Sequence, residues 1–152
     1  MNGTERIEKF LSSNDLGLTG GHQAGIHVPK DPEILSFLPA LHPQMENPRT
    51  AIKLTDVVDH STWTVNYIYY NNRLRGGTRN EYRITGLTTY LRNRQAYPGD
   101  LIFLERLSEL RYEVGIEARA DRSVDGKASS DATSESTVLL VPRSWIVGKK
   151  RK

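Results

Sequence analysis

Hydrophobic residues alternate with polar ones over several short stretches of this chain, the pattern of strands that bury one face. The clearest stretch runs from Trp63 to Tyr70 and is rich in aromatic and β-branched residues, which favour strands. Shorter strands are predicted within residues 26–28, 50–58, 79–85, 101–104, 112–116 and 137–141. The sequence therefore predicts a mainly β domain.

Helical spacing is limited to two short segments. Asp31-Pro32-Glu33 supplies an N-cap, a proline at the first helical position and an acid in the first turn, and apolar residues follow at helical spacing. Residues 87–95 are compatible with a second short helix, and residues 6–12 fit either a helix or a strand. With no internal repeat, we expect one domain over residues 1–148 and a basic tail at 149–152.

Two segments without periodicity are predicted loops. Residues 13–25 contain four glycines among Asn, Asp, Ser and Thr, a composition typical of a long loop with a permissive backbone. Residues 121–136 are rich in Ser and Asp, so a flexible surface loop is expected there.

Composition excludes several classes of protein. The 152 residues contain no cysteine, which rules out disulfides, thiolate metal sites and a thiol nucleophile. No apolar run approaches the ~18 residues of a membrane-spanning helix, and the first residues lack the order of a signal peptide. We expect a soluble, cytoplasmic protein with no membrane contact.

The net charge of +3 hides an uneven distribution. Residues 71–94 hold six arginines against one glutamate, a net of +5, and the tail Lys149-Lys150-Arg151-Lys152 adds +4. The rest of the chain carries −6, from 11 basic and 17 acidic residues. Arginine presents a planar fork of donors that binds phosphate or a guanine edge, although a solvated basic loop would look the same.

Motifs for catalysis are weak. The glycine-rich segment is not followed by the Lys-Ser or Lys-Thr of a phosphate-binding loop, and no dinucleotide fingerprint is present. The four histidines lack metal-ligand spacing. Asp125-Gly126-Lys127 superficially resembles part of a nuclease site, but it lies in a predicted flexible loop, where metal ligands are poorly held. No catalytic residue, metal or cofactor is therefore predicted.

Binding of nucleic acid fits two segments better. Backbone amides of a glycine-rich loop approach phosphates closely, and its Asn, Thr, His and Gln side chains are of the types that contact base edges. In an extended segment Arg79, Glu81 and Arg83 share one face. A glutamate carboxylate accepts a hydrogen bond from cytosine N4, just as an arginine donates to guanine, so Glu81 is a candidate for base contact. The alternative is that Glu81 only orients the neighbouring arginines.

The same two segments resemble a known family. In chain order they contain Ser13-Asn14-Asp15, Gly17, Thr19-Gly20-Gly21-His22-Gln23, Ile68-Tyr69-Tyr70-Asn71, Arg73, Thr78-Arg79-Asn80-Glu81 and Arg83-Ile84-Thr85. From about Phe10 to Thr85 the sequence closely resembles the N-terminal effector-binding domain of EcoRII-like type IIE restriction endonucleases. Residues 97–103 are similar to a strand of the plant B-three transcription-factor domains, which share the same DNA-binding pseudobarrel fold.

The resemblance implies a seven-stranded mixed β pseudobarrel with short flanking α-helices, and two arms that grip the major groove of double-stranded DNA. The N-arm, residues 14–23, would bind through Asn14, Asp15, Thr19, Gly20, Gly21, His22 and Gln23. The C-arm, residues 73–85 with the preceding Asn71, would bind through Asn71, Arg73, Arg75, Gly77, Thr78, Arg79, Asn80, Glu81 and Arg83. Gly77 stands where the family carries a lysine, and Arg75 is a candidate substitute.

The resemblance also implies a role. The domain would bind a short CCWGG-like site as an effector in a prokaryotic cell, would not be catalytic by itself, and would work with a separate C-terminal nuclease domain. Two alternatives stay open. Tyr67, Tyr69, Tyr70 and Tyr82 flank the arginines, so RNA or single-stranded nucleic acid could stack there. The second alternative is that the chain is a complete small magnesium-dependent nuclease.

Overall fold

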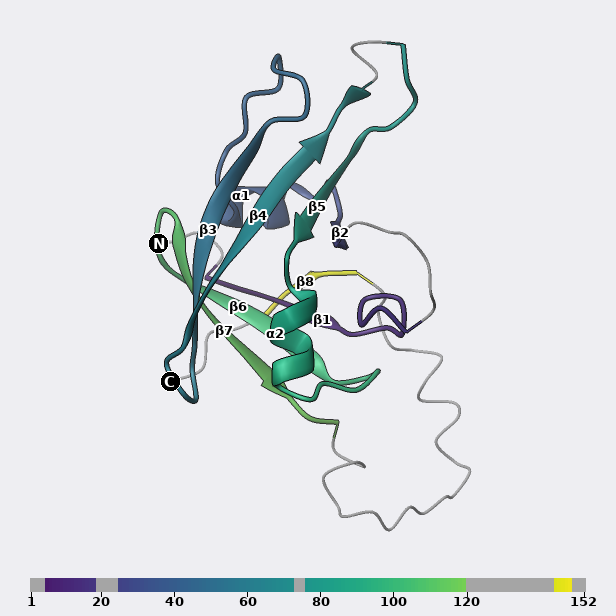
Figure 1. The fold of residues 1–152 in the computed structure, drawn as a ribbon. Coiled ribbons are helices and arrows are strands. Elements are labelled where there is room, and N and C mark those ends of the chain that lie inside the picture. Colours follow the sequence, from purple (N-terminus) through teal and green to yellow (C-terminus); the bar gives the residue numbers. More distant parts are fainter. Residues whose placement is uncertain (1–4, 19–24, 73–75, 120–143, 149–152) are drawn as a thin grey trace.

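The computed structural model describes residues 5–18, 25–72, 76–119 and 144–148, and in these residues eight strands form one curled sheet (Figure 1). The strands are β1 (Arg6–Phe10), β2 (Ile26–Val28), β3 (Arg49–Asp56), β4 (Thr62–Tyr70), β5 (Glu81–Thr85), β6 (Leu101–Ser108), β7 (Arg111–Glu117) and β8 (Ile146–Val147). The two helices are α1 (Pro32–Phe37) and α2 (Thr88–Asn93).

The strands lie in the order β2-β5-β4-β3-β7-β6-β1-β8. All neighbours are antiparallel except β3 and β7, which are parallel, so the sheet is mixed. Strand β5 is short and lies between the longer β4 and the edge strand β2. The segments before β5 and before β2 are the two predicted arms, so both arms adjoin this end of the sheet.

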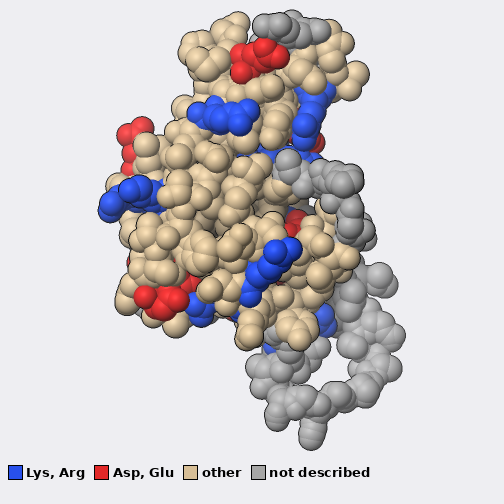
Figure 2. All heavy atoms as spheres, in the orientation of Figure 1, with Lys and Arg blue, Asp and Glu red and all other residues tan. Residues whose placement is uncertain are grey.

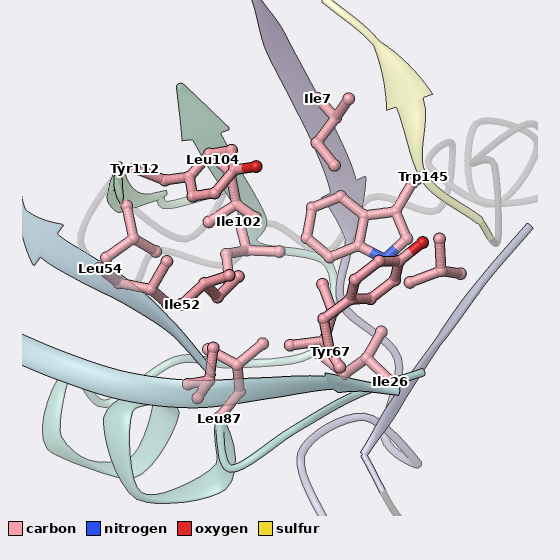
Figure 3. Close-up of a cluster of buried hydrophobic side chains, with 14 of the residues drawn as sticks. Ile7, Ile26, Ile52, Leu54, Tyr67, Leu87, Ile102, Leu104, Tyr112 and Trp145 are labelled. Carbon is pink, nitrogen blue, oxygen red and sulfur yellow. The ribbon is translucent and has the colours of Figure 1, made fainter. Parts of the chain in front are cut away.

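One hydrophobic core fills the concave side of the sheet. It contains residues from both edges of the sheet: Ile26 of β2 at one edge, and Ile7 and Trp145 beside β8 at the other. Figure 3 shows Trp145 in one cluster with Ile26 and with Tyr67 of β4. Because these side chains are almost fully buried, the open edges of the sheet are joined through the core.

The helices cover the ends of the core. Asp31 caps α1, since its carboxylate accepts a hydrogen bond from the Glu33 amide at 2.8 Å, and Phe37 of α1 packs on the Tyr112 ring at 5.1 Å. In α2, the Tyr90 hydroxyl donates to the buried carboxylate of Asp56 at 2.7 Å. No helix in the described part of the chain is long and apolar enough to cross a membrane.

The predicted β pseudobarrel and both short helices are confirmed, with differences in detail. Seven strands were expected, and the described residues contain eight, among them the short strand β8 beside β1, which the sequence pattern did not predict. The ambiguous residues 6–12 form a strand as far as Phe10, and the strand expected over 79–85 begins at Glu81. The strand predicted at 137–141 and the loop predicted at 121–136 lie outside the described residues.

Gly25 joins the N-arm to the sheet at a point where no other residue fits. Its φ is +79°, and a Cβ there would lie 2.2 Å from the carbonyl oxygen of Ile84 and 2.8 Å from the Cα of Thr85. Both contacts are to the backbone of β5, which cannot move away without breaking its pairing with β2. The close approach of two backbones therefore depends on this glycine.

We expect Gly25→Ala to destabilise the protein by at least about 2 kcal/mol, because it combines an unfavourable φ with a backbone collision. Gly17→Ala is the matched control, since Gly17 has a φ of +75° but nothing within 4 Å of its Cβ position. Gly17→Ala should lower the free energy of unfolding by about 1 kcal/mol. Urea unfolding of both variants measures the difference, and equal losses would contradict the account of the Gly25 contact.

Candidate nucleic-acid interface

The C-arm projects from the body of the protein at the tip of the β4–β5 hairpin (Figure 1). Asn71, at the end of β4, is 4 % exposed and fastens this tip to the segment before β3. Its side-chain oxygen accepts from the Asn47 amide at 2.6 Å, and its side-chain nitrogen donates to the Met45 carbonyl at 2.7 Å. The amide group of Asn71 is thus used within the fold, and its expected contact with DNA stays a prediction.

Asn72 shapes the described end of the C-arm. Its carbonyl accepts from the Gly77 amide at 2.9 Å, and its side-chain oxygen accepts from the backbone amide of Arg79 at 2.7 Å. A Cβ at Gly77 would lie 2.6 Å from the Asn72 side chain. A lysine at this position would thus displace Asn72, so the glycine belongs to this turn.

Arg79 is held at its guanidinium by two neighbours. Its Nε donates to Oε2 of Glu81 at 2.8 Å, and its guanidinium carbon lies 3.9 Å from the centre of the Tyr70 ring. Tyr70 and Glu81 are paired across β4 and β5, so they lie on the same face of the sheet. The Arg79 side chain is 41 % exposed, which leaves the outer end of its guanidinium accessible.

Arg83 has a different position. Its side chain is only 10 % exposed, its Nε donates to the same Glu81 oxygen at 3.0 Å, and its Nη1 donates to the Gly25 carbonyl at 3.1 Å. The residue therefore connects the start of β5 with the end of the segment that carries the N-arm. The printed contacts of Nε and Nη1 thus lie within the fold, and the expected contact of Arg83 with DNA stays a prediction.

Two neighbouring arginines lower the pKa of the Glu81 carboxyl group. Partial burial by itself raises the pKa of Glu81, but hydrogen bonds from Arg83 and Arg79 outweigh it and hold the pKa below its usual value. Glu81 is thus ionised, and one carboxylate offsets part of two positive charges. Desolvation and then the charge of Arg83 lower the pKa of His27, so this histidine adds no charge at pH 7.

The start of the N-arm forms a capped turn. The Ser12 amide donates to Oδ2 of Asp15 at 2.9 Å, while the Asp15 amide donates to the Ser12 hydroxyl at 3.1 Å. Asp15 also forms an ion pair with Lys9, and both side chains are largely buried. Asp15 therefore fixes the base of the arm, and its expected contact with DNA stays a prediction. Asn14 lies on the exposed side of the turn.

The remaining predicted contacts divide by position. Thr78 and Gly77 are exposed, and Asn80 is half-buried and accepts from the Tyr69 hydroxyl at 2.6 Å. Predicted contacts that lie outside the described residues are Thr19, Gly20, Gly21, His22, Gln23, Arg73 and Arg75. Tyr70, which belongs to the resembling motif and to the possible stacking rings but not to the predicted contacts, lies against Arg79.

The arginine-rich segment does not make a continuous basic patch in the described residues. Arg79 and Arg83 share Glu81, and Arg94 pairs with Asp59 at 3.1 Å and with Asp56 at 3.8 Å. Figure 2 shows separate blue areas on a mostly uncharged face. Among the described arginines of this segment, Arg79, Arg83 and Arg94 form ion pairs and Arg92 is exposed.

The tyrosines opposite this face pack on one another. The rings of Tyr69 and Tyr82 are stacked at 4.3 Å with an interplanar angle of 10°, and Tyr82 also stacks on the buried Tyr67 at 5.8 Å. Each of these rings thus already has a protein partner.

Within residues 5–18, 25–72, 76–119 and 144–148, no group of three or more His, Asp or Glu side chains is placed to hold a metal ion. The Asp125-Gly126-Lys127 segment lies outside these ranges.

Comparison with solved structures shows the fold. FUS3 of Arabidopsis, solved as a complex with DNA, has a TM-score of 0.55 and 20 % identity, over 74 % of this chain and 96 % of that one. The N-terminal domain of LlaJI.R1 from Helicobacter pylori has a TM-score of 0.53 and 11 % identity, over 97 % and 99 % of the two chains. The fold expected from the resemblance is thus confirmed.

Comparison by sequence shows the family. Over 80 residues the chain is 42 % identical to the type II restriction enzyme EcoRII of Escherichia coli. This aligned region is 51 % of this chain and 19 % of that protein. The chain thus matches about a fifth of the relative's length. The model of the family "Restriction endonuclease EcoRII, N-terminal" matches residues 2–152. Since that match covers nearly the whole chain, the protein belongs to the EcoRII N-terminal family.

Proposed function

We propose that this chain binds double-stranded DNA at a specific sequence, with both arms in one major groove, as the recognition part of a restriction endonuclease. Family membership supports the link to restriction, because the E. coli relative is a type II restriction enzyme. The likeness in fold to FUS3, which was solved with DNA, supports the choice of ligand.

The observation that carries the proposal is the arrangement of Arg79. Its Nε donates to Glu81, its guanidinium carbon lies 3.9 Å from the centre of the Tyr70 ring, and its side chain remains 41 % exposed. Two parallel N–H donors match O6 and N7 of guanine in the major groove. An arginine held in this way suits the reading of a base better than a general contact to phosphate.

The spacing of the arms favours a duplex. The C-arm enters β5 at Glu81, and the N-arm reaches the sheet at Gly25, which lies against Ile84 and Thr85 near the other end of β5. Four steps along a strand span about 13 Å. The major groove of B-DNA is ~12 Å wide, so arms that leave the sheet at this separation suit its two sides.

On the basis of the family resemblance, we further propose that the target is CCWGG-like, that this domain alone does not catalyse a reaction, and that a nuclease domain is its working partner. Glu81 keeps a second carboxylate oxygen, Oε1, beside the arginine pair, and this oxygen suits the N4 amino group of a cytosine. Arg79 and Glu81 together would then discriminate G·C pairs.

Single-stranded nucleic acid is a poorer candidate ligand. Stacking of bases requires free aromatic faces, whereas Tyr69 and Tyr82 stack on each other and Tyr67 is buried. Tyr70 is covered by Arg79.

Arg79→Ala should weaken binding to a CCWGG duplex by roughly 10- to 100-fold, the loss of a bidentate guanine contact of about 1–3 kcal/mol. Binding to a duplex with a scrambled site should change little, since few phosphate contacts are lost. Mobility-shift titrations of both duplexes measure the two affinities. Arg92→Ala, on the exposed end of α2, is the matched control and should leave the ratio unchanged. Equal affinity of the unaltered protein for both duplexes would refute sequence-specific binding.

Arg83→Gln should lower the free energy of unfolding by about 1.5–3 kcal/mol, because charge-assisted hydrogen bonds to Glu81 and to the Gly25 carbonyl are lost. Urea unfolding without DNA measures this effect. Should the variant keep full stability while losing only the preference for the specific duplex, Arg83 would be a base-contacting residue and not an internal connection.

A further inference from the structure

We infer that Tyr70 is a positioning residue that determines guanine selectivity by setting the plane of the Arg79 guanidinium. This inference rests on the proposed function and deepens it. Tyr70 itself would not need to touch DNA, because it would act through Arg79.

Two contacts restrain Arg79 in different ways. The Tyr70 ring, 3.9 Å below the guanidinium carbon, restricts tilting of the guanidinium plane. The hydrogen bond from Nε to Glu81, at 2.8 Å, restricts rotation within that plane. The backbone amide of Arg79 is held by the Asn72 side chain, so the base of the side chain is fixed as well.

The plane matters for base reading in particular. Two donors meet O6 and N7 of one guanine only when the guanidinium is nearly coplanar with that base. A phosphate accepts from many directions and responds mainly to the positive charge. Loss of the ring should therefore reduce discrimination between sites more than it reduces general affinity for DNA.

The position of Tyr70 separates it from the neighbouring tyrosines. Tyr70 pairs with Glu81 on the outer face of the hairpin, whereas Tyr69 pairs with Tyr82 on the face that leads into the core. Tyr69 and Tyr82 stack on each other, while the partner of the Tyr70 ring is a cation at the tip of a projecting arm. A ring needed only for packing would not require this placement.

The test compares Tyr70→Leu with Tyr70→Phe, which keeps the flat ring. Each variant is titrated with the CCWGG duplex, with a scrambled duplex, and with a CCWGG duplex in which 7-deazaguanine replaces guanine and removes the N7 acceptor. Tyr97→Leu makes the same chemical change at a side chain that is 57 % exposed and lies between α2 and β6, outside the β4–β5 hairpin. Thermal unfolding of every variant is measured alongside.

Tyr70→Leu should lower affinity for the specific duplex roughly two- to fivefold, with little change for the scrambled one. The penalty for 7-deazaguanine, roughly tenfold in the unaltered protein, should shrink to under about threefold. Tyr70→Phe and Tyr97→Leu should keep the full penalty. Should Tyr70→Leu fail to fold, Tyr70→Met replaces it with the same expectation.

Two failures are distinguishable. If the unaltered protein does not separate the specific duplex from the scrambled one, the proposed function fails. If it does separate them, and a folded Tyr70→Leu or Tyr70→Met variant keeps the full 7-deazaguanine penalty, the role of Tyr70 is overturned while the proposed function stands.

Discussion

The pairing of β5 with β4 on one side and β2 on the other determines where both arms leave the sheet. The strand is only five residues long, yet its start carries the C-arm and its end lies against Gly25, where the N-arm rejoins the sheet. A strand resists stretching because its rise per residue is nearly constant. The separation of the arms is therefore set by backbone geometry, and side chains only adjust the orientation of what the arms carry.

The Glu81 carboxylate holds two arginine side chains at the start of β5. One carboxylate oxygen accepts from Arg79, which faces outward, and from Arg83, which faces inward and also holds the Gly25 carbonyl. The arginines thus differ despite their alternate spacing: the Arg83 side chain is mostly buried and connects the arms, whereas the Arg79 side chain is more exposed and is the one that we propose for DNA contact. An acid among arginines reduces general attraction to phosphate, but it fixes the direction of a fork of donors, which is the property that reading of a base requires.

Much of this fold is predictable from the sequence because alternation and caps act locally. Trp63 to Tyr70 alternates over a full strand, and Asp31-Pro32 marks the start of α1. The short strand β8 was not predicted, because Ile146–Val147 is too short to show a pattern. Exposure of the site residues was harder to predict, since Arg83, Asn71 and Asp15 acquire their partners from Gly25, Asn47 and Lys9, contacts that only the folded chain brings together. Tyr70 was missed for the same reason: its partner is nine residues away across a hairpin.

The central claim is that both arms occupy the major groove of one duplex. Methylation interference tests it directly, because dimethyl sulfate modifies guanine at N7 in the major groove and adenine at N3 in the minor groove. A labelled CCWGG duplex, sparsely methylated, is divided into bound and free fractions by the protein. With both arms in the major groove, N7-methylated guanines of the site should be depleted from the bound fraction while N3-methylated adenines are retained. Depletion of N3-methylated adenines with no effect at guanine N7 would contradict it.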